Sequence, residues 1–515
     1  MTRFLNPSLD SLEDPFTFQD MQKAVDRIHL AVSRGEKILV YGDYDVDGIT
    51  GSAILYPVLK KIGADADVHI PHRMNEGYGL NKESLRTLMA KKYGLVITVD
   101  NGITGVDEIR FLAENKVDTI IVDHHTPKGE VPPAYAIISA AVFDQKGDPN
   151  LAACGVAFKL GWALLGSLDP MKEYLDLAVI GTVADLAPVL GDNRILLKNG
   201  LAVLANSKRP GVRALMDVAK ISRKYVSYRD IAFGLGPRIN ASGRMGSPLT
   251  AFRLLTTENP LEARNLAQIL DDGNRDRQRV ESLAFESAVE QMEEDPLLSE
   301  TKILVAASSD WHEGVLGIVA ARLVERYQKP AIVIAIKNGK GKGSGRSLPA
   351  FSIFEAVLPC EKLLENFGGH AQACGLTIKE ENILSFRKKL NELTLAPSNS
   401  AADLAIEAEL LPETLNMGFL QDLEKLAPFG PGNRKPLFLS KGLRLRGEPK
   451  KRGKDTLQCW MSDGQGKTTC EVVGFRSYSR WVSTPKRDDF DIVYQPTLKD
   501  FNGISSIQLE LEDWR

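Results

Sequence analysis

The first 190 residues alternate short apolar runs with segments in which apolar residues recur every three to four positions. The segments of the second kind, such as Ile49–Ile62, have the spacing of amphipathic helices. The short runs are rich in β-branched residues and predict strands at 37–41, 68–70, 95–99, 119–122 and 136–138. This alternation predicts a parallel sheet covered by helices, and therefore an α/β fold.

The remaining chain shows three further patterns. Residues 260–294 predict one long amphipathic helix. A second, smaller α/β unit follows, with strands at 303–306 and 331–336, and the polar residues 397–400 then predict a linker. From 402 to 515 short alternating strands and turns predict a small β-barrel or sandwich. We therefore expect four parts, at residues 1–255, 256–296, 297–396 and 400–515.

Length and composition indicate an ordinary globular protein of several domains, with 515 residues, 43% hydrophobic and 25% charged. A net charge of -3 and a pI near 6.2 provide no overall attraction for nucleic acid, so a polyanion would need a local basic surface or metal ions. The five cysteines form no CxxC pair and no zinc spacing, which indicates reduced thiols. No apolar run has the length of a signal peptide or membrane span, so we expect a cytoplasmic protein without membrane contact.

Three aspartates at alternate positions, Asp43, Asp45 and Asp47, directly follow the first predicted strand. Carboxylates this close repel one another, and a bound divalent cation is the usual compensation. The alternative is helix capping, which is common for Asp at such a position. Capping would account for one aspartate, with Asp47 before Gly48 as the candidate, but not for all three. The cluster therefore predicts half of a metal site.

Two further predicted strands end in groups of the same kind. Asp100 follows the strand at 95–99, and Asp123-His124-His125 follow the strand at 119–122. Because ligands of parallel sheets lie at the carboxyl ends of the strands, we expect these side chains near the aspartate cluster. Imidazole with carboxylates suits manganese or zinc, while the oxygen-rich set keeps magnesium open. Adjacent histidines on an extended segment would point in opposite directions, so one would bind metal and the other would face the substrate.

Asp185 is a single acid in the apolar stretch Gly181–Pro188. An acid in such surroundings is rarely buried without a partner, although a helix-end cap is an alternative. It would complete a site for two metal ions with Asp45, Asp47, Asp100 and His124. Two ions bridged by a carboxylate can orient a water and stabilise the leaving oxygen of a phosphodiester. The residues alone thus predict a two-metal phosphoesterase.

Several sequence blocks carry a resemblance to known proteins. The motifs of the DHH phosphoesterase superfamily are similar to DYDVDG at 43–48, VDNG at 99–102, DHH at 123–125 and GTVAD at 181–185. The signature of the DHH-associated domain resembles FGGHAQACGLTI at 367–378. Over nearly the whole chain the sequence resembles the RecJ family, through EGYGL at 76–80, GPRINASGRMGSP at 236–248, NRDRQ at 274–278, WHEGVLGIVAARL at 311–323, GSGRS at 343–347 and LAPFGPGNRKP at 426–436.

The resemblance implies roles for individual residues. The implied metal ligands are Asp45, Asp47, Asp100, His124 and Asp185. Asp100 and His125 are implied in catalysis, with His125 contacting the scissile phosphate or the attacking water, and Asp43 is a further acid beside them. The implied phosphate-binding residues are Arg73, Ser344 and Arg346 at a terminal 5′ phosphate, with Arg244 and His370 near the DNA backbone. For the glycine-rich segment at 341–347, a flexible hairpin tip is the alternative interpretation.

The resemblance also implies an architecture and an activity. The parts would be a DHH catalytic domain, a connecting helix, a DHH-associated substrate-binding domain and a C-terminal OB-like nucleic-acid-binding domain. The activity would be a metal-dependent 5′→3′ exonuclease that degrades single-stranded DNA to 5′-mononucleotides in repair and recombination. The implied cofactors are two manganese or magnesium ions, and the implied partners of a monomeric enzyme are a single-strand-binding protein and a RecQ-type helicase.

Two other classes of function remain as alternatives. One is a DHH-family phosphodiesterase that acts on nanoRNA, phosphoadenosine phosphate or cyclic dinucleotides, with pyrophosphatase or polyphosphatase activity more remote; such an enzyme would lack the final β domain. The other is a non-catalytic, Cdc45-like scaffold, which would not need the full set of acids and histidines. The sequence by itself does not determine metal preference, processivity or tolerance of RNA.

Three local features modify this picture. Tyr41 stands where some superfamily members have a histidine that binds the first metal ion, so the first metal site has one ligand fewer than in those members. The chain also starts closer to its first predicted strand than RecJ proteins often do. In the last domain Trp460 and Phe475 could stack on bases, although aromatics of small barrels are mostly core. The basic run beside them, which could follow a phosphate backbone or be a solvated turn, is Arg444, Arg446, Lys450, Lys451, Arg452 and Lys454. Gly466-Lys467-Thr468 resembles part of a P-loop, but Met461 replaces its first glycine, so ATP use is not indicated.

Overall fold

The computed structural model describes residues 2–73, 76–127, 129–142, 147–296, 298, 300–394, 404–485, 487–501 and 504–515. The described chain forms two compact units. We call residues 13–185 and 200–394 the two-sheet unit, and residues 2–12, 186–199 and 404–515 the barrel unit. The polar segment 397–400 lies outside the described residues.

The first sheet of the two-sheet unit is fully parallel, with strand order β2-β1-β3-β4-β5. Its strands are β1 (Lys37–Gly42), β2 (Asp65–His69), β3 (Tyr93–Val99), β4 (Asp118–Val122) and β5 (Ala136–Ile138). Each lies within a few residues of a predicted run, because β-branched residues dominate strands that are buried on both faces. The predicted α/β fold is confirmed.

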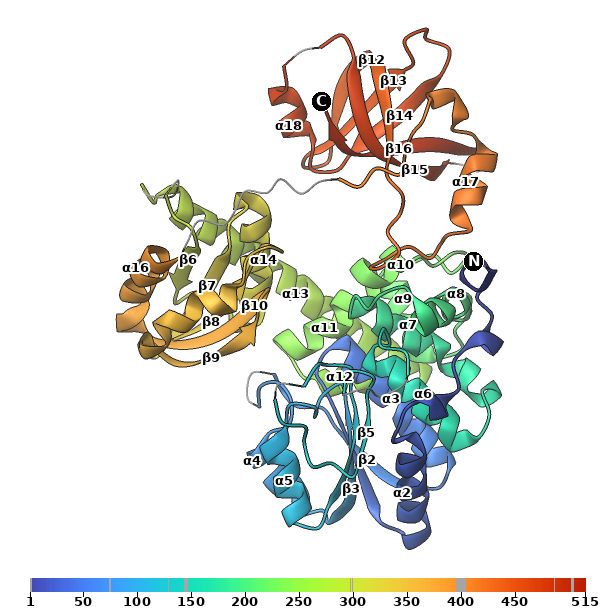
Figure 1. Ribbon diagram of the computed structural model, residues 1–515, viewed down its shortest axis with the longest axis vertical. Coiled ribbons are helices and arrows are strands. Elements are labelled where there is room, and N and C mark those ends of the chain that lie inside the picture. The colour runs from blue at the N-terminus through green and yellow to red at the C-terminus, as the bar shows by residue number, and fades with distance from the viewer. Residues whose placement is uncertain are drawn as a thin grey trace. The chain divides into compact units, whose positions relative to one another are not determined.

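Helices cover both faces of this sheet (Figure 1). One face packs against α4 (Lys82–Met89) and α5 (Val106–Glu114), with Leu39 and Tyr41 of β1 in the shared core. The helices associated with the other face are α2 (Met21–Arg34), α3 (Val46–Lys61), α6 (Ala153–Leu165) and α7 (Leu175–Ala184). α3 and α7 pack closely, since a Cβ on Gly181 would lie 2.3 Å from Thr50 Oγ1. α3 and α7 are therefore in direct contact where Gly181 of α7 lies against Thr50 of α3.

A helical segment connects the first sheet with the second. Its elements are α8 (Gly191–Ala205), α9 (Pro210–Val218), α10 (Tyr228–Asp230), the π-helix η4 (Ile231–Leu235), α11 (Gly236–Met245), α12 (Pro248–Thr256) and α13 (Pro260–Glu293). α13 is the predicted long helix, 34 residues without a break. Gly273 does not interrupt it and faces open space, where no packing depends on a side chain.

The second sheet is mixed, with strand order β6-β7-β8-β10-β9 and only β6 and β7 parallel. Its strands are β6 (Leu304–Ser308), β7 (Ala331–Lys337), β8 (Lys340–Arg346), β9 (Leu364–His370) and β10 (Ala373–Lys379). One face packs on α13 and α14 (Leu316–Tyr327), and the other on α15 (Ile353–Val357) and α16 (Ile383–Leu393). The glycine-rich segment at 341–347 is thus a central strand and not a hairpin tip, because its glycines face the Ile334 and Leu376 side chains.

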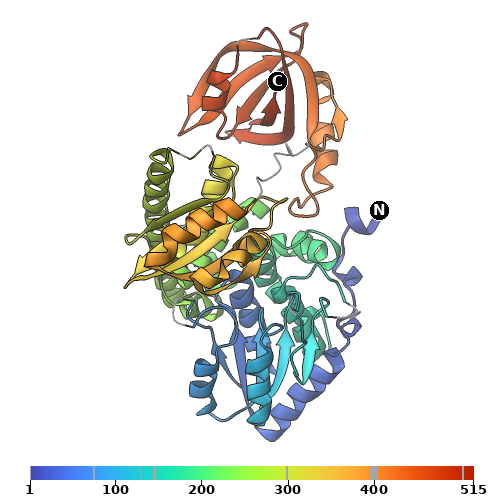
Figure 2. The ribbon, with the colours of Figure 1, turned by 60° about the vertical axis from the view of Figure 1, so that its left-hand side comes forward.

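The barrel unit contains the predicted small β domain (Figure 2). Its sheet order is β11-β12-β13-β14-β16-β15, and an additional pairing of β12 with β15 closes it. The strands are β11 (Ala408–Glu409), β12 (Phe438–Arg452), β13 (Thr456–Ser462), β14 (Thr469–Gly474), β15 (Phe490–Phe501) and β16 (Ile504–Trp514), and the helices are α1 (Thr2–Leu5), α17 (Met417–Glu424) and α18 (Tyr478–Ser483). β13 and β14 form an antiparallel hairpin in which Ser462 pairs with Thr469.

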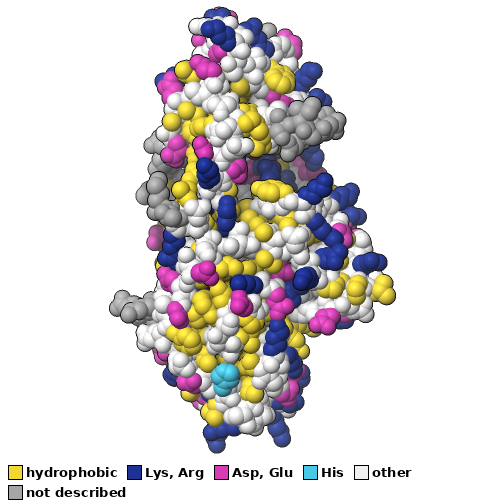
Figure 3. All heavy atoms as spheres, turned by 90° about the vertical axis from the view of Figure 1, so that its right-hand side faces the viewer, with side chains coloured by type: hydrophobic (Ala, Val, Ile, Leu, Met, Phe, Trp, Pro, Cys, Tyr) yellow, Lys and Arg dark blue, Asp and Glu magenta, His cyan; other side chains and the backbone are white. Residues whose placement is uncertain are grey.

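Surface charge is mixed on the face drawn in Figure 3, where basic, acidic and apolar side chains are interspersed. Attraction for a charged ligand must therefore come from local clusters and not from a field of one sign. In the described part of the chain, no helix combines the length and apolarity needed to span a bilayer.

Candidate metal centre and phosphate site

Three neighbouring strands deliver acidic groups to one edge of the first sheet. Asp43 follows β1, Asp100 follows β3, and Asp123 follows β4. The ladder continues into these residues: the Asp43 N–H donates to Val99 O at 3.1 Å, and the Asp100 N–H donates to Val122 O at 2.9 Å. The strands thus fix these positions side by side, at the carboxyl edge where α/β sheets bind ligands.

Asp45 and Asp47 are held by helix termini. Asp45 is the N-cap of α3, and its Oδ1 accepts hydrogen bonds from the N–H groups of Asp47 at 3.0 Å and Gly48 at 3.2 Å. The expectation that Asp47 is the cap was wrong, because the helix begins at Val46 and places Asp47 in its first turn. The Asp47 carboxylate instead accepts from the N–H groups of Ala153 and Cys154, at 2.7 and 2.9 Å, where α6 begins.

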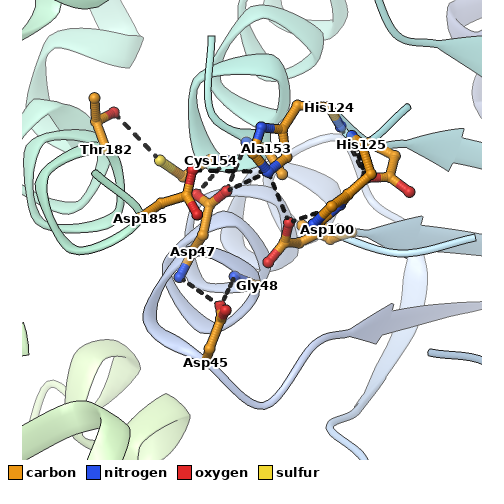
Figure 4. Close-up of polar contacts among 12 residues, drawn as sticks. Asp45, Asp47, Gly48, Asp100, His124, His125, Ala153, Cys154, Thr182 and Asp185 are labelled. Atoms are coloured by element: carbon orange, nitrogen blue, oxygen red, sulfur yellow. Dashed lines mark hydrogen bonds and ion pairs between the residues drawn. The ribbon is translucent and has the colours of Figure 1, made fainter. Parts of the chain in front are cut away.

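Asp185 and His124 complete the arrangement. Asp185 is the C-cap of α7, and His124 lies two residues beyond β4. His124 Nε2 lies 3.4 Å from an oxygen of Asp100, 3.7 Å from Asp185 and 3.8 Å from Asp47. Figure 4 shows these side chains converging from α3, α7 and the strand ends. Asp185 thus lies at a helix end, as the capping alternative expects, and its carboxylate also points to the same centre as the residues at the strand ends.

The candidate ligand atoms fall into three overlapping groups. Within each group the atoms lie within 4.8 Å of one another, and the groups are Asp43, Asp45 and Asp100; Asp47, His124 and Asp185; and Asp100, His124 and His125. Asp100 is shared between the first group and the third, and His124 between the second and the third. The geometry offers two adjacent cation positions on either side of Asp100 and His124.

Unpaired buried atoms show that these residues fit divalent cations. Among the residues that the structure describes, Asp43 Oδ1, Asp100 Oδ1 and His124 Nε2 are buried and have no hydrogen-bond partner. Such atoms are costly unless a ligand completes them. The separations of 3.4–3.8 Å around His124 correspond to no hydrogen bond of Nε2, and they are close to the roughly 3 Å between neighbouring ligands of one ion with bonds near 2.1 Å.

Electrostatics lead to the same interpretation. Burial, followed by the charge of Asp45, raises the pKa values of Asp43 and Asp100 well above their usual range. Burial and then the charges of Asp47 and Asp45 raise the pKa of Asp185 to about 8. Without a cation, ionising all of these carboxylates costs free energy because they repel one another in a buried site. A bound divalent cation would offset that repulsion.

The backbone at Asp100 adopts a conformation that L-residues rarely use, with φ of 64°. Left-handed backbone at a residue other than glycine is strained and is found where surrounding structure requires it. Here the hydrogen bond from Asp100 N–H and those of Asn101 Nδ2 to the carbonyls of Tyr41 and Val99, at 3.2 and 2.9 Å, hold the turn. The turn directs the Asp100 carboxylate into the cluster.

The two histidines lie on the same side of the segment, so the expectation of opposite directions was wrong. Their ring centroids are 4.5 Å apart. The segment is not extended, because Asp123 Oδ1 accepts from the N–H groups of both His124 and His125, at 2.8 and 3.1 Å, and curls the backbone. His125 Nδ1 also lies 2.8 Å from that oxygen. Burial lowers the pKa of His125, but the hydrogen bond and charge of Asp123 outweigh it and raise the pKa to about 9.

Tyr78 is a neighbour of the site that the sequence did not single out. Its hydroxyl lies 3.4 Å from His125 Nδ1, and its ring packs edge-on against His125 and Tyr44. It is still 51% exposed, so it borders the open side of the cluster. The sequence feature that could have indicated Tyr78 is Gly77-Tyr78-Gly79, because both glycines adopt positive φ and the turn directs the tyrosine ring outwards.

A second cluster, which we call the arginine cluster, consists of Arg73, Arg244, Arg277 and Arg346. Burial, then repulsion from Arg73, Arg277 and Arg346, lowers the pKa of Arg244 to about 10. Burial and Arg73 likewise lower the pKa of Arg346. Arg277 pairs with Glu281 at 2.5 Å, whereas Arg244 Nη1 donates to a neutral group, the Gly314 carbonyl, at 3.1 Å. Close cations with so little compensation favour an anionic ligand.

Arg346 has neighbours that match the predicted phosphate site. Its Nη1 donates to Ser344 Oγ at 3.1 Å, and a Cβ on Gly317 would lie 2.7 Å from its Nη2. His370 is exposed on β9 and shares a register row with Arg346, since both are paired with Ala373. Residues in one row project from the same face, so His370 stands two strands away from Arg346, roughly 10 Å. Arg277 is the member of the cluster that sequence reasoning missed, although it lies in the block NRDRQ.

Other candidates are placed outside the metal cluster. Tyr41 is buried in the core beside α4 and α5, and its hydroxyl donates to the Gly79 carbonyl at 3.4 Å. Its ring packs on His69, with the ring centroids 5.0 Å apart, so its recorded contacts are with this core and with Gly79. In the barrel unit Trp460 and Phe475 are 49% and 50% exposed, so neither is a core residue.

Comparisons with known proteins agree with this geometry. Residues 37–182 match the DHH family N-terminal domain, residues 300–395 match the DHHA1 domain, and residues 406–513 match the RecJ OB domain. A crystal structure of RecJ from Thermus thermophilus in complex with Mn²⁺ superimposes with a TM-score of 0.85 at 32% identity, covering 100% of this chain and 74% of that one. The α/β fold with a C-terminal OB domain is thus confirmed.

Sequence relatives carry the same name. The single-stranded-DNA-specific exonuclease RecJ of Bacillus subtilis is 35% identical over 99% of this chain, which spans 65% of that protein. The RecJ exonuclease of Escherichia coli is 32% identical over 96% of this chain, which spans 90% of that protein. With both domain matches and the metal-centre geometry in agreement, the chain belongs to the RecJ family of DHH proteins.

Proposed function

We propose that this chain is a metal-dependent 5′→3′ exonuclease that degrades single-stranded DNA to 5′-mononucleotides in repair and recombination. The observation that carries the proposal is the pair of clusters in one unit, in which buried carboxylates with unpaired oxygens accompany half-buried arginines. A phosphodiester supplies negative charge for the arginines and oxygens for a cation. The names of the RecJ relatives support DNA as the substrate.

The metal ligands follow from the two groups of donor atoms. Asp45 and Asp100, with Asp43, would hold one ion, and Asp47, His124 and Asp185 would hold the second, with Asp100 between them. When bound, two divalent ions would supply the charge that stabilises the attacking and leaving oxygens of a phosphodiester. The Thermus thermophilus RecJ was solved with Mn²⁺ and with Mg²⁺, which supports these two metals here. The unpaired oxygen of Asp43 supports a role as ligand and not only as a neighbouring acid.

His125 would act on the phosphate through hydrogen bonding. Its Nδ1 faces Asp123, which fixes the ring and keeps the imidazole protonated near neutral pH, with a pKa of about 9. A protonated ring held in this way can donate from Nε2 to a phosphate oxygen and stabilise charge that develops there. Tyr78 borders the same space and would limit how the terminal nucleotide enters.

The arginine cluster would select the 5′ end. Arg346 with Ser344, and Arg73 and Arg244 beside them, offer planar donors that match phosphate oxygens. A phosphate at a chain end presents more oxygens and more charge than one inside the chain. The cluster therefore favours a terminal 5′ phosphate, and hydrolysis at the metal centre would release one nucleotide at a time.

The barrel unit supports a substrate longer than a dinucleotide. Half-exposed Trp460 on β13 stands opposite Arg446 on β12, which is the combination of stacking ring and cation found on single-strand binding surfaces. A phosphodiesterase for dinucleotides would have no use for such a domain. A scaffold would have no use for unpaired buried carboxylates, which cost stability without a cation.

The test is a digestion series with end-labelled DNA and Mn²⁺ or Mg²⁺. We expect mononucleotides from the 5′ end of single strands, with little attack on blunt duplex and none in EDTA. Matched 5′-phosphate and 5′-hydroxyl oligonucleotides report the terminal preference, and dinucleotides serve as the competing substrate. Release from the 3′ end, equal digestion of duplex, or activity confined to dinucleotides would contradict the proposal.

A further inference from the structure

A large pocket lies in the two-sheet unit, away from the metal cluster. Its volume is about 1020 Å³, and its lining includes Tyr56, Lys60, Asp176, Lys208, Arg209 and Leu255. α3 and α7 both connect it with the cluster, because each helix has one end at the pocket and the other at a metal-ligand candidate. A helix of the 16 residues of α3 is about 24 Å long, so the pocket is a separate site.

The floor of the pocket is a rigid polar network. Asp176, which is 1% exposed, accepts from Ser207 Oγ at 2.7 Å and from Arg209 Nε at 3.2 Å. Arg209 Nη2 also donates to the Glu173 carbonyl at 3.2 Å, and the guanidinium lies over the Tyr174 ring at 4.7 Å. Arg209 is therefore oriented in advance, at the N-terminus of α9, where no side chain caps the helix.

The charge that remains at the pocket is positive. Asp176 is neutralised by Arg209, and the Glu173 side chain is paired with Lys61. Lys60 and Lys208 also line the pocket, both are exposed, and neither has a carboxylate partner among the described residues. The remaining acid in the lining is Glu258, which is exposed at the rim. Two exposed lysines without a carboxylate partner among the described residues favour a ligand with phosphate-like charge.

The other walls are apolar or aromatic. Tyr56 lies between the Lys60 ammonium, 5.5 Å from its ring, and Phe252, 5.7 Å away. Partly exposed Pro57 and Val203 add apolar surface that suits a flat ring. The volume is at the upper end of the roughly 300–1,000 Å³ usual for small-molecule sites and can hold a nucleotide with its phosphates.

We propose that this pocket binds a free nucleoside phosphate, with Lys60 and Lys208 on its phosphate groups and the base against the apolar wall that Tyr56 and Val203 form. The site is distinct from the phosphate site at Arg346 and does not depend on the proposed exonuclease activity. Binding there would leave the metal cluster free, so substrate and pocket ligand could be held at the same time.

Hydrogen–deuterium exchange of the full chain in EDTA, with and without 5 mM ADP, tests the proposal. We expect ADP to slow exchange at least twofold in peptides covering 54–61 and 206–213, and adenosine to have no effect because it lacks phosphate. The same protection should persist in an Arg244→Gln/Arg346→Gln variant, which weakens the other phosphate site. It should disappear in Lys60→Glu/Lys208→Glu.

The control variant is Lys220→Glu/Lys388→Glu, which changes the same charge at exposed lysines outside the pocket lining and should keep the protection. Melting temperatures of all variants establish that they fold. The proposal is overturned if ADP protects neither segment, if Lys60→Glu/Lys208→Glu retains the effect, or if a dT12 oligonucleotide protects the segments while ADP does not. The last result would make this a DNA-tracking surface.

Discussion

The two-sheet unit contains two clusters of like charge that differ in how they are built. The carboxylate cluster draws its members from the first sheet and from the two adjoining helices α3 and α7. The arginine cluster draws one member each from the loop after β2, from α11, from α13 and from β8. The carboxylates are mostly buried and the arginines are half-buried, and both clusters are only partly compensated. The carboxylate cluster forms at the carboxyl edge of the first sheet. The arginine cluster forms only where the part of the unit with the first sheet meets the part with the second sheet.

The shared features of the two clusters support the proposal that each binds a ligand of the opposite charge. Burial is the first cause of the shifted pKa values in both, and repulsion between neighbours adds to it. Neither cluster gains stability from this arrangement, so a ligand has to supply the compensation. Cations at one and phosphate at the other are the chemistry of phosphodiester hydrolysis.

The largest effect should come from Asp100→Ala. This change removes the carboxylate between the two cation positions, so we expect kcat to fall about 10³-fold or more, as for loss of several kcal/mol of charge stabilisation. Mn²⁺ binding measured by calorimetry should weaken in parallel, while binding of single-stranded DNA in EDTA stays within a few-fold. The exposed Asp26→Ala serves as control. Normal turnover in Asp100→Ala would remove the basis of the two-cation assignment.

The next effect should come from Arg346→Gln, which breaks the arginine cluster and leaves the carboxylates intact. Loss of a charged hydrogen bond to phosphate is worth about 1.5–3 kcal/mol, or roughly 10–100-fold. We expect that loss in kcat/KM for 5′-phosphorylated single strands and a much smaller one for 5′-hydroxyl strands. The exposed Arg253→Gln on α12 is the matched control. An equal loss on both substrates would show that Arg346 does not read the terminal phosphate.

Stability of the metal-free protein should depend on pH through Asp185. Its folded pKa of about 8 lies above the usual 3.8, so between these values the folded state retains a proton that the unfolded chain has released. Stability therefore falls as pH rises through this window. In EDTA we expect a melting temperature lower by several degrees at pH 8 than at pH 5.

Two comparisons isolate this effect. Asp185→Asn should flatten the pH dependence, and Mn²⁺ should restore the melting temperature of the native sequence at pH 8 but raise that of the variant much less. Calorimetry over pH 5–8 measures both. A slope that is unchanged in Asp185→Asn would assign the pH dependence to other groups.

The smallest effect should separate the two roles of Asp45. Asp45→Asn keeps a side-chain oxygen that can cap α3, so we expect unfolding within about 0.5 kcal/mol of the native protein, although activity is lost with the charge. Asp45→Ala loses the cap as well and should unfold about 1 kcal/mol more easily. Urea denaturation in EDTA measures the difference. Equal stability of the two variants would mean that the cap contributes nothing.

Sequence reasoning located the carboxylate cluster because its residues directly follow recognisable strands. A strand end is a local feature, and parallel strands place their ends together without further information. The sequence did not predict how His124 and His125 are oriented, because their orientation depends on Asp123 accepting hydrogen bonds from the N–H groups of both histidines. The cap was misplaced for a similar reason, because helix starts cannot be read to within three residues.

The sequence by itself determined the α/β order, the long helix α13, the final barrel and the positions of the acids, because hydrophobic spacing and strand ends are local properties. Only the tertiary structure decided that Arg73, Arg244, Arg277 and Arg346 meet, that Tyr41 faces a core and that a cationic pocket lies at the far ends of α3 and α7. These features depend on segments that lie far apart in the sequence, such as those that carry Arg73 and Arg346, and no local pattern records which distant segments come together.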